Sequence, residues 1–127
     1  MIDVPTLQDW IDKLGFDAVL DSPTMLRVSA REGAPLPSFF IQCTENWVLL
    51  SILRLLDGDA FRPDDLGRRL LAANREMRVA KFALDQDGEV LLCAELPTES
   101  LDLSELADAM HRMAQYARRF RTEFLGE

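Results

Sequence analysis

Apolar residues recur at every second position in the stretch from residue 79 to residue 96. Two alternating runs there flank Asp87-Gly88. The residues that share a face are Ala80, Phe82 and Leu84 in the first run, and Val90, Leu92, Ala94 and Leu96 in the second. Glycine adopts the positive φ that a tight hairpin turn requires. The pattern therefore predicts a β-hairpin with one buried face.

The period changes to three and four residues near the end of the chain. An unbroken apolar stripe is formed by Leu103, Leu106, Met110, Met113, Ala117, Phe120 and Phe124. The positions between them are mostly charged or polar. This spacing predicts a long amphipathic helix that covers the apolar face of the hairpin.

The first part of the chain predicts a short helix followed by four strands. The helix starts at Pro5-Thr6 with Thr6 as its N-cap, carries the apolar face Leu7, Trp10, Ile11 and Leu14, and ends at the C-cap candidate Gly15. The four strands are expected over residues 16–20, 25–31, 38–44 and 47–55. The fourth is apolar on both faces except at Ser51 and Arg54, as in a central strand or one covered on its second side.

A second helix is expected between the fourth strand and the hairpin. Pro63 stands at its first helical position and Asp64-Asp65 lie in its first turn, where the helix dipole favours them. It runs to about Arg75 and its apolar face is Leu66, Leu70, Ala73 and Met77. The order α-β-β-β-β-α-β-β-α predicts an α+β fold with a mainly antiparallel sheet. We expect one domain over the 127 residues.

The charge balance bears on the partner. The chain has 14 basic and 22 acidic side chains and a net charge of −8, which counts against nucleic acid. The N-terminus lacks a signal-peptide pattern, and the most apolar segment, residues 47–56, is far shorter than the ~20 residues of a membrane span. Cys43 and Cys93 form no CxxC motif and are expected to be buried, reduced thiols. We therefore expect a cytoplasmic protein without membrane or nucleic-acid partners.

No catalytic motif is recognisable. The acidic residues from Asp57 to Asp65 and the sequence Asp85-Gln86-Asp87-Gly88 both fail the calcium-loop pattern. His111 is the one histidine, and the two cysteines are far apart, so a usual structural zinc site is not expected. The chain has neither a glycine-rich phosphate loop nor a GxSxG motif. We expect no enzyme activity, no metal and no cofactor.

Several apolar residues are candidates for contact with a protein partner. They are Trp10, Leu14, Phe40, Trp47 and Leu49. If the helices cover only one face of the sheet, the residues Phe40, Trp47, Leu49 and Leu53 include some that form an exposed interaction surface. Two alternatives stay open: the first helix, with Trp10, is simply core cover, or a second helix covers the other sheet face.

The second half of the chain carries a recognisable series of motifs. They are Leu70-Leu-Ala-Ala-Asn-Arg75, Leu84-Asp-Gln-Asp-Gly-Glu-Val-Leu-Leu92, Leu96-Pro97 and Leu103-Ser-Glu-Leu106 before a long last helix. This series resembles the superfamily of type III secretion chaperones (the Tir-chaperone family) and the related YbjN-like proteins. The upstream segment Glu45-Asn-Trp-Val-Leu-Leu50 is more similar to the YbjN-like branch.

The resemblance implies a compact, acidic and catalytically inert α/β protein. In the chaperone branch it implies a homodimer that wraps an extended segment of a client polypeptide. The face of the second helix around Leu66, Leu70 and Met77 would then meet a second copy, or else its own core. In the YbjN-like branch it implies a stand-alone domain associated with regulation or stress, acting through a folded protein partner.

Overall fold

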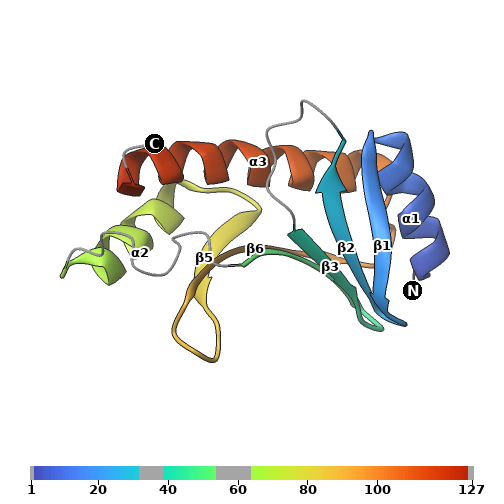
Figure 1. Cartoon of the computed structure of the whole chain (residues 1–127), viewed down its shortest axis with the longest axis horizontal. Helices are drawn as coiled ribbons and strands as arrows, with labels where there is room; N and C mark the ends of the chain where they lie inside the picture. Colours follow the sequence, from blue (N-terminus) through green and yellow to red (C-terminus); the bar gives the residue numbers. More distant parts are fainter. Residues whose placement is uncertain (1, 32–38, 54–63, 126–127) are drawn as a thin grey trace.

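The computed structural model describes residues 2–31, 39–53 and 64–125 (Figure 1). The elements in chain order are α1 (Val4–Lys13), β1 (Phe16–Ser22), β2 (Met25–Ala30), β3 (Phe39–Cys43), β4 (Trp47–Ile52), α2 (Leu66–Glu76), β5 (Ala80–Leu84), β6 (Val90–Pro97) and α3 (Leu103–Leu125). The expected α+β class and the order α-β-β-β-β-α-β-β-α are confirmed.

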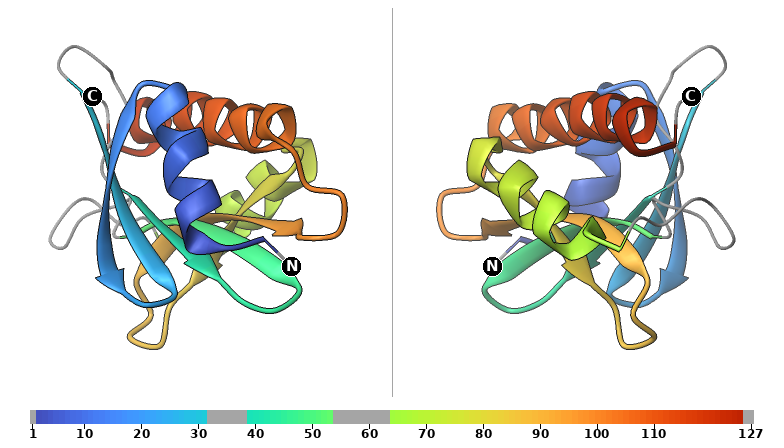
Figure 2. Two further views of the ribbon diagram at one scale, coloured as in Figure 1. Left: turned by 90° about the vertical axis from the view of Figure 1, so that its right-hand side faces the viewer. Right: turned by 90° about the vertical axis from the view of Figure 1, so that its left-hand side faces the viewer.

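The strands form one antiparallel sheet in the order β1-β2-β3-β4-β6-β5. The hairpin strand β6 therefore lies beside β4, where Leu50 is opposite Ala94 and Val48 is opposite Leu96. Figure 2 shows the curved sheet with α1 and α3 inside its concave face, and α2 next to β5. The strands β1 and β5 are the two edges of the sheet.

A single apolar core fills the space between this face of the sheet and the helices. Its members include Leu7 and Ile11 of α1, Leu70, Ala73 and Met77 of α2, and Leu106, Ala109, Met110, Met113, Ala117 and Phe120 of α3. The rings of Phe82 and Phe120 meet edge to face, with centroids 5.1 Å apart. The predicted helical stripe is confirmed from Leu106 to Phe120, and the side chain of Phe124 lies outside the described residues.

The start of α1 differs from the prediction. Asp3 is the N-cap, and its carboxylate accepts a hydrogen bond of 2.8 Å from the backbone N–H of Thr6. The prediction of Thr6 as N-cap is wrong because Pro5 fits inside the first turn, where its missing N–H removes no helical bond. The end of the helix agrees with the prediction, since Gly15 follows the C-cap Leu14 with a φ of +92°.

The β5–β6 hairpin is confirmed, with Gly88 at a φ of +80°. The polar support of the turn comes from Asp85, whose Oδ1 accepts hydrogen bonds from the N–H groups of Asp87 (2.8 Å) and Glu89 (2.9 Å). Leu84 lies on the same face as Phe82, opposite the buried Val90, but its side chain is exposed because it is the last residue of the edge strand β5.

Other boundaries shift by a few residues. β1 extends to Ser22 rather than ending at residue 20, and α2 begins at Leu66 and ends at Glu76. The prediction that Asp64 and Asp65 lie in the first turn of α2 is wrong, since Asp65 is the N-cap, and β4 ends at Ile52. The expected helix start at Pro63 and the expected strand residues 54–55 lie outside the described residues.

Candidate functional site: the outer face of the sheet

We call the sheet face opposite the helix-covered core the outer face. Its residues alternate with the buried core positions along the strands. They include Met25 and Arg27 of β2, Phe40 and Gln42 of β3, Trp47, Leu49 and Ser51 of β4, and Leu91, Cys93 and Glu95 of β6. None of these side chains belongs to the buried core. Six of the ten residues are apolar, which is a high share for a sheet face that the three helices do not cover.

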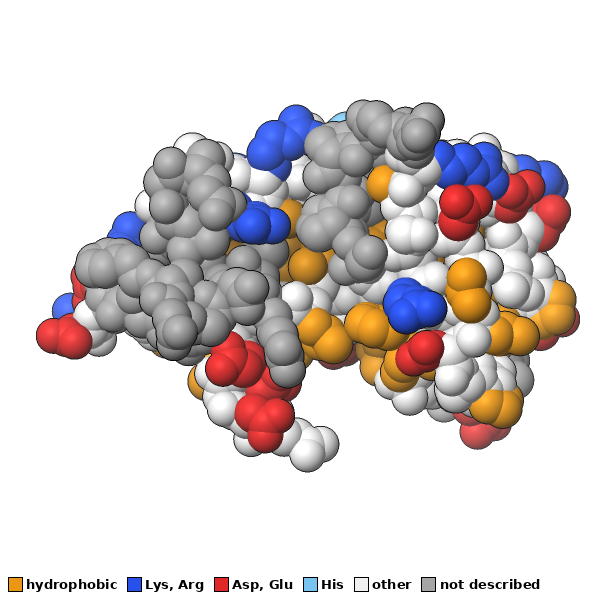
Figure 3. Space-filling view, in the orientation of Figure 1, with side chains coloured by type: hydrophobic (Ala, Val, Ile, Leu, Met, Phe, Trp, Pro, Cys, Tyr) orange, Lys and Arg blue, Asp and Glu red, His pale blue; other side chains and the backbone are white. Residues whose placement is uncertain are grey.

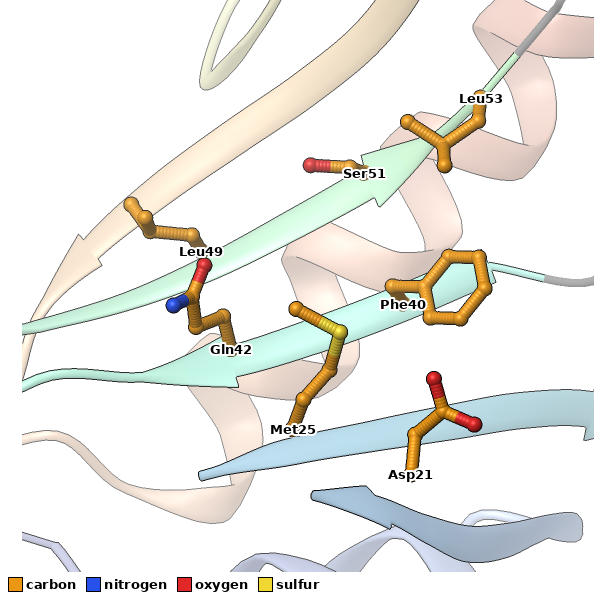
Figure 4. Close-up of a pocket in the computed structure, with 7 residues that line it drawn as sticks. All are labelled: Asp21, Met25, Phe40, Gln42, Leu49, Ser51 and Leu53. Carbon is orange, nitrogen blue, oxygen red and sulfur yellow. The ribbon is translucent and has the colours of Figure 1, made fainter. Parts of the chain in front are cut away.

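A hollow of about 370 Å³ lies on this face, and we call it the outer hollow. Its lining comes from β1 to β4 and from the residue after β4: Asp21, Met25, Phe40, Gln42, Leu49, Ser51 and Leu53 (Figure 4). The sheet register explains why they meet, since Gln42 is opposite both Met25 and Leu49, and Phe40 is opposite Ser51. An apolar floor with a few polar groups is typical of a binding site.

Large apolar side chains remain open to solvent on the same face. Trp47 is 45% exposed and Leu53 is 46% exposed, while Phe40 and Leu49 are partly buried. Figure 3 shows apolar side chains gathered among charged ones over the lower ends of β1 to β3, in the orientation of Figure 1. The outer hollow thus lies within a wider apolar surface.

The structure divides the five predicted partner-binding residues into two groups. Phe40 and Leu49 line the outer hollow, and Trp47 lies on the same face at the start of β4. Trp10 and Leu14 lie on α1, partly buried against the core on the opposite side of the sheet. Contact of these residues with a partner stays a prediction.

The α2 face that was expected to meet either a second copy or its own core packs largely inward. Leu70 and Met77 are buried in the chain's own core, and Leu66 is partly buried against it. The exposed apolar residues here are Leu71 (71% exposed) and Leu84 (65% exposed). Both line a second hollow of about 250 Å³, together with Gly67, Leu70, Asn74, Phe82 and Ala83.

The two sheet edges differ. At β5 the side-chain amide of Asn74 donates a hydrogen bond of 3.2 Å to the carbonyl of Phe82, and its Oδ1 accepts one of 2.6 Å from the Phe82 N–H. At β1 two apolar side chains, Val19 and Leu20, are exposed, and the pairing with β2 is interrupted by a β-bulge. Of the two edges, β1 is the one suited to accept an added strand.

The two thiols are both free, but only Cys43 is buried as expected. The expectation is wrong for Cys93, which is partly exposed because it points to the outer face. Burial raises the pKa of each thiol, and at Cys93 the neighbouring Glu95 adds to this effect while Lys81 opposes it. Both thiols are therefore mainly protonated and weakly reactive near neutral pH.

Within residues 2–31, 39–53 and 64–125, no three His, Cys, Asp or Glu side chains come together in a way that could hold a metal ion. No helix in the described part of the chain is long and apolar enough to cross a membrane.

Four lining residues of the outer hollow were missed by the sequence reasoning: Asp21, Met25, Gln42 and Ser51. Gln42 and Ser51 alternate with the inward-facing Ile41 and Leu50, so their outward direction follows from the pattern. Met25 could have been found, because it precedes the inward-facing Leu26 and so points outward. Asp21 was missed because the predicted first strand ended at residue 20, although alternation with Val19 places it on the outer face.

The fold and this surface define a small α+β protein with one helix-covered face of its sheet and one apolar outer face. The chain belongs to the Tir chaperone protein (CesT) family, which matches residues 7–121. No curated protein matches the sequence.

Solved structures with the same fold include both branches of the resemblance. One is a chain of the heterodimeric ExoU–SpcU complex from the type III secretion system of Pseudomonas aeruginosa (TM-score 0.66, 22% identity, covering 89% of this chain and 93% of the other). Another is YbjN from E. coli (TM-score 0.68, 19% identity, covering 96% of this chain and 93% of the other). A third is a chain of the HopA1–SchA chaperone–effector complex (TM-score 0.67, 18% identity, covering 95% of this chain and 98% of the other).

Proposed function

We propose that this protein is a non-enzymatic, cytoplasmic chaperone that holds an extended segment of a client polypeptide on the outer face of its sheet. The observation that carries the proposal is the outer hollow, an apolar site on a face that α1, α2 and α3 leave uncovered. Membership of the Tir chaperone protein family supports it. So do the structural neighbours, one a chain of a heterodimeric complex from a type III secretion system and another a chain of a chaperone–effector complex.

The physical basis is burial of client side chains in the outer hollow. Burying one large apolar side chain contributes roughly 1.5–3 kcal/mol. Two or three apolar client side chains packed against Phe40, Leu49 and Leu53 would therefore offset the cost of ordering a short client segment. The edge strand β1 offers backbone hydrogen bonds to the same segment. The net charge of −8 would keep a chaperone–client complex in solution.

Affinity purification from the native host, followed by mass spectrometry, tests this proposal. The wild type should retain one dominant polypeptide in near-equal amount. Leu53→Glu, at an exposed position in the outer hollow, should release it because a charge replaces an apolar contact. Gln115→Glu adds the same charge at an exposed position on α3 and should retain it. Equal recovery with both variants, at unchanged melting temperature, would contradict the proposal.

The likeness to YbjN supports a second candidate, a regulatory domain that acts through a folded protein partner. The two functions differ in what the partner must present. A client segment of a chaperone binds as an unfolded fragment, whereas a folded partner loses binding when it is denatured or cut. Binding of the recovered partner's isolated fragments to this protein therefore separates the two.

We also propose that the protein forms a homodimer through α2 and β5. The exposed Leu71 and Leu84, which flank the second hollow, support this arrangement more strongly than the inward-packed Leu70 and Met77. Sedimentation equilibrium should show a mass that rises with concentration in the wild type and stays monomeric in Leu71→Glu. A wild type that remains strictly monomeric at high concentration would rule out this dimer.

A further inference from the structure

We infer that Asp21 selects client segments that carry a Lys or Arg next to their apolar anchors. This inference rests on the proposed function of the outer face. It concerns Asp21, a charged side chain that lines the outer hollow beside apolar ones.

The local backbone explains why Asp21 reaches the outer hollow. In the β1–β2 pair, Leu20 is opposite Leu26 and Ser22 is opposite Met25, so Asp21 is the extra residue of a bulge. Alternation from Val19, which is opposite the outward-facing Arg27, already places Asp21 on the outer face, and the bulge leaves Asp21 without a directly opposite residue on β2. Figure 4 shows the Asp21 carboxylate directed toward the side chains of Met25 and Phe40.

The charge at this position has no partner among the described residues. Of the described residues that line the outer hollow, Asp21 alone is ionisable, and its carboxylate forms no ion pair or hydrogen bond with the described part of the chain. The neighbouring carboxylates differ, since Asp17 pairs with Arg31 at 3.0 Å and Glu95 with Lys81 at 3.7 Å. Asp21 is therefore available to a cation from a partner.

Two basic residues of the described strands share this surface, Arg27 of β2 and Lys81 of β5, and Lys81 is paired with Glu95. Arg27 is opposite both Val19 and Phe40 in the register of the sheet. It does not line the outer hollow, and no ion pair joins it to Asp21. Arg27 thus leaves the negative charge inside the outer hollow in place, and the net charge of −8 adds to the preference for a cation.

The ligand that fits this arrangement is an extended peptide with one or two large apolar residues and an adjacent Lys or Arg. The apolar residues occupy the floor around Phe40 and Leu49, and the cation pairs with the Asp21 carboxylate. An exposed ion pair adds modest affinity, about two- to fivefold, so its main effect is on which segment is chosen.

Selection from a displayed library of random 12-residue peptides tests the inference with wild type, Asp21→Asn and Glu95→Gln. The wild type should enrich apolar residues together with Lys or Arg. Asp21→Asn should keep the apolar enrichment and lose the basic one. Glu95→Gln removes the same charge from the same sheet face, outside the outer hollow, and should keep both.

Two outcomes would overturn the inference alone: an unchanged basic preference in Asp21→Asn, or an equal loss in Glu95→Gln. The absence of any enriched peptide, or an enrichment that Leu53→Glu leaves unaltered, would overturn the proposed function itself and the inference with it. Measured with one selected peptide, Asp21→Asn should weaken binding about two- to fivefold, and replacing the peptide's basic residue by norleucine should remove that difference.

Discussion

The side chain of Asn74 pairs with the backbone of Phe82 as a neighbouring strand would. Its amide donates to the Phe82 carbonyl at 3.2 Å and accepts from the Phe82 N–H at 2.6 Å. Phe82 lies in the edge strand β5, so helix α2 satisfies the hydrogen-bonding groups of this edge at its middle residue. The same contact holds α2 against the sheet beside the proposed dimer surface.

Asn74→Ala should destabilise the fold. It removes two hydrogen bonds, each worth about 1 kcal/mol, and this loss is partly offset by the higher helix propensity of alanine. We expect the free energy of unfolding in urea to fall by about 1–2 kcal/mol. Arg75→Ala, at the next and exposed position, should change it by less than about 0.5 kcal/mol. Equal effects of the two substitutions would show that the edge contact contributes nothing.

The protein should be more stable with glycine than with alanine at position 79, in place of Val79. The φ of Val79 is +71°, which is costly for any residue with a Cβ, and the N–H of Ala80 bonds to the carbonyl of Arg78 across it in a γ-turn. In an ordinary position alanine exceeds glycine by about 0.5–1 kcal/mol. We expect Val79→Gly to melt at a higher temperature than Val79→Ala. The reverse order would show that the positive φ is not retained in solution.

Met110→Glu should prevent folding. Met110 is 3% exposed in the stripe of α3, and a carboxylate buried there without a partner costs several kcal/mol, a large part of the stability of a small domain. Circular dichroism should show a loss of cooperative melting. His111→Glu, at the adjacent exposed position, should melt like the wild type. Unchanged melting of Met110→Glu would mean that the stripe is not core.

Stability should fall in acid partly through two helix caps. The pKa of Asp3 is lowered by hydrogen bonds from Thr6, and the pKa of Asp102 is lowered by hydrogen bonds from Ser104 and Glu105. A lowered pKa means that the ionised carboxylate stabilises the fold above about pH 4, and that this contribution is lost as the pH falls through the native pKa.

The measurement for these caps is the melting temperature between pH 2.5 and pH 6. Asn caps a helix without titrating, so Asp3→Asn and Asp102→Asn should each flatten the decline below pH 4. Asp87→Asn, in the exposed hairpin turn where the side chain of Asp85 accepts the bonds, is the control and should not. A decline identical in all four proteins would assign the acid sensitivity to other groups.

Local patterns were enough to predict most of the fold. The two-residue period around Asp87-Gly88 and the three-to-four spacing of α3 both reflect burial on one side of a regular element, and both appear in the structure. The prediction was wrong at the start of α1, and Leu84, although on the predicted face, is exposed. A residue period does not indicate whether Asp3 or Thr6 caps the helix. Nor does it indicate which residue ends an edge strand, because both depend on contacts outside the repeating pattern.

The candidate site was predicted only in part. Alternation in β3 and β4 identified Phe40, Trp47 and Leu49 as residues of one face. It could not show that β1 and β2 extend this face, because strand order is a long-range property. Nor did it include Asp21, because the predicted first strand ended at residue 20 whereas β1 extends to Ser22.

Site-specific photo-crosslinking in the native host tests the central claim most directly. A photoreactive amino acid at Leu53 in the outer hollow should crosslink to the client, whereas the same residue at Gln115 on α3 should not. Mass spectrometry of the Leu53 adduct should identify an extended client segment, which this account predicts to contain apolar residues next to a Lys or Arg. Crosslinks to the client from Gln115, with none from Leu53, would contradict the account.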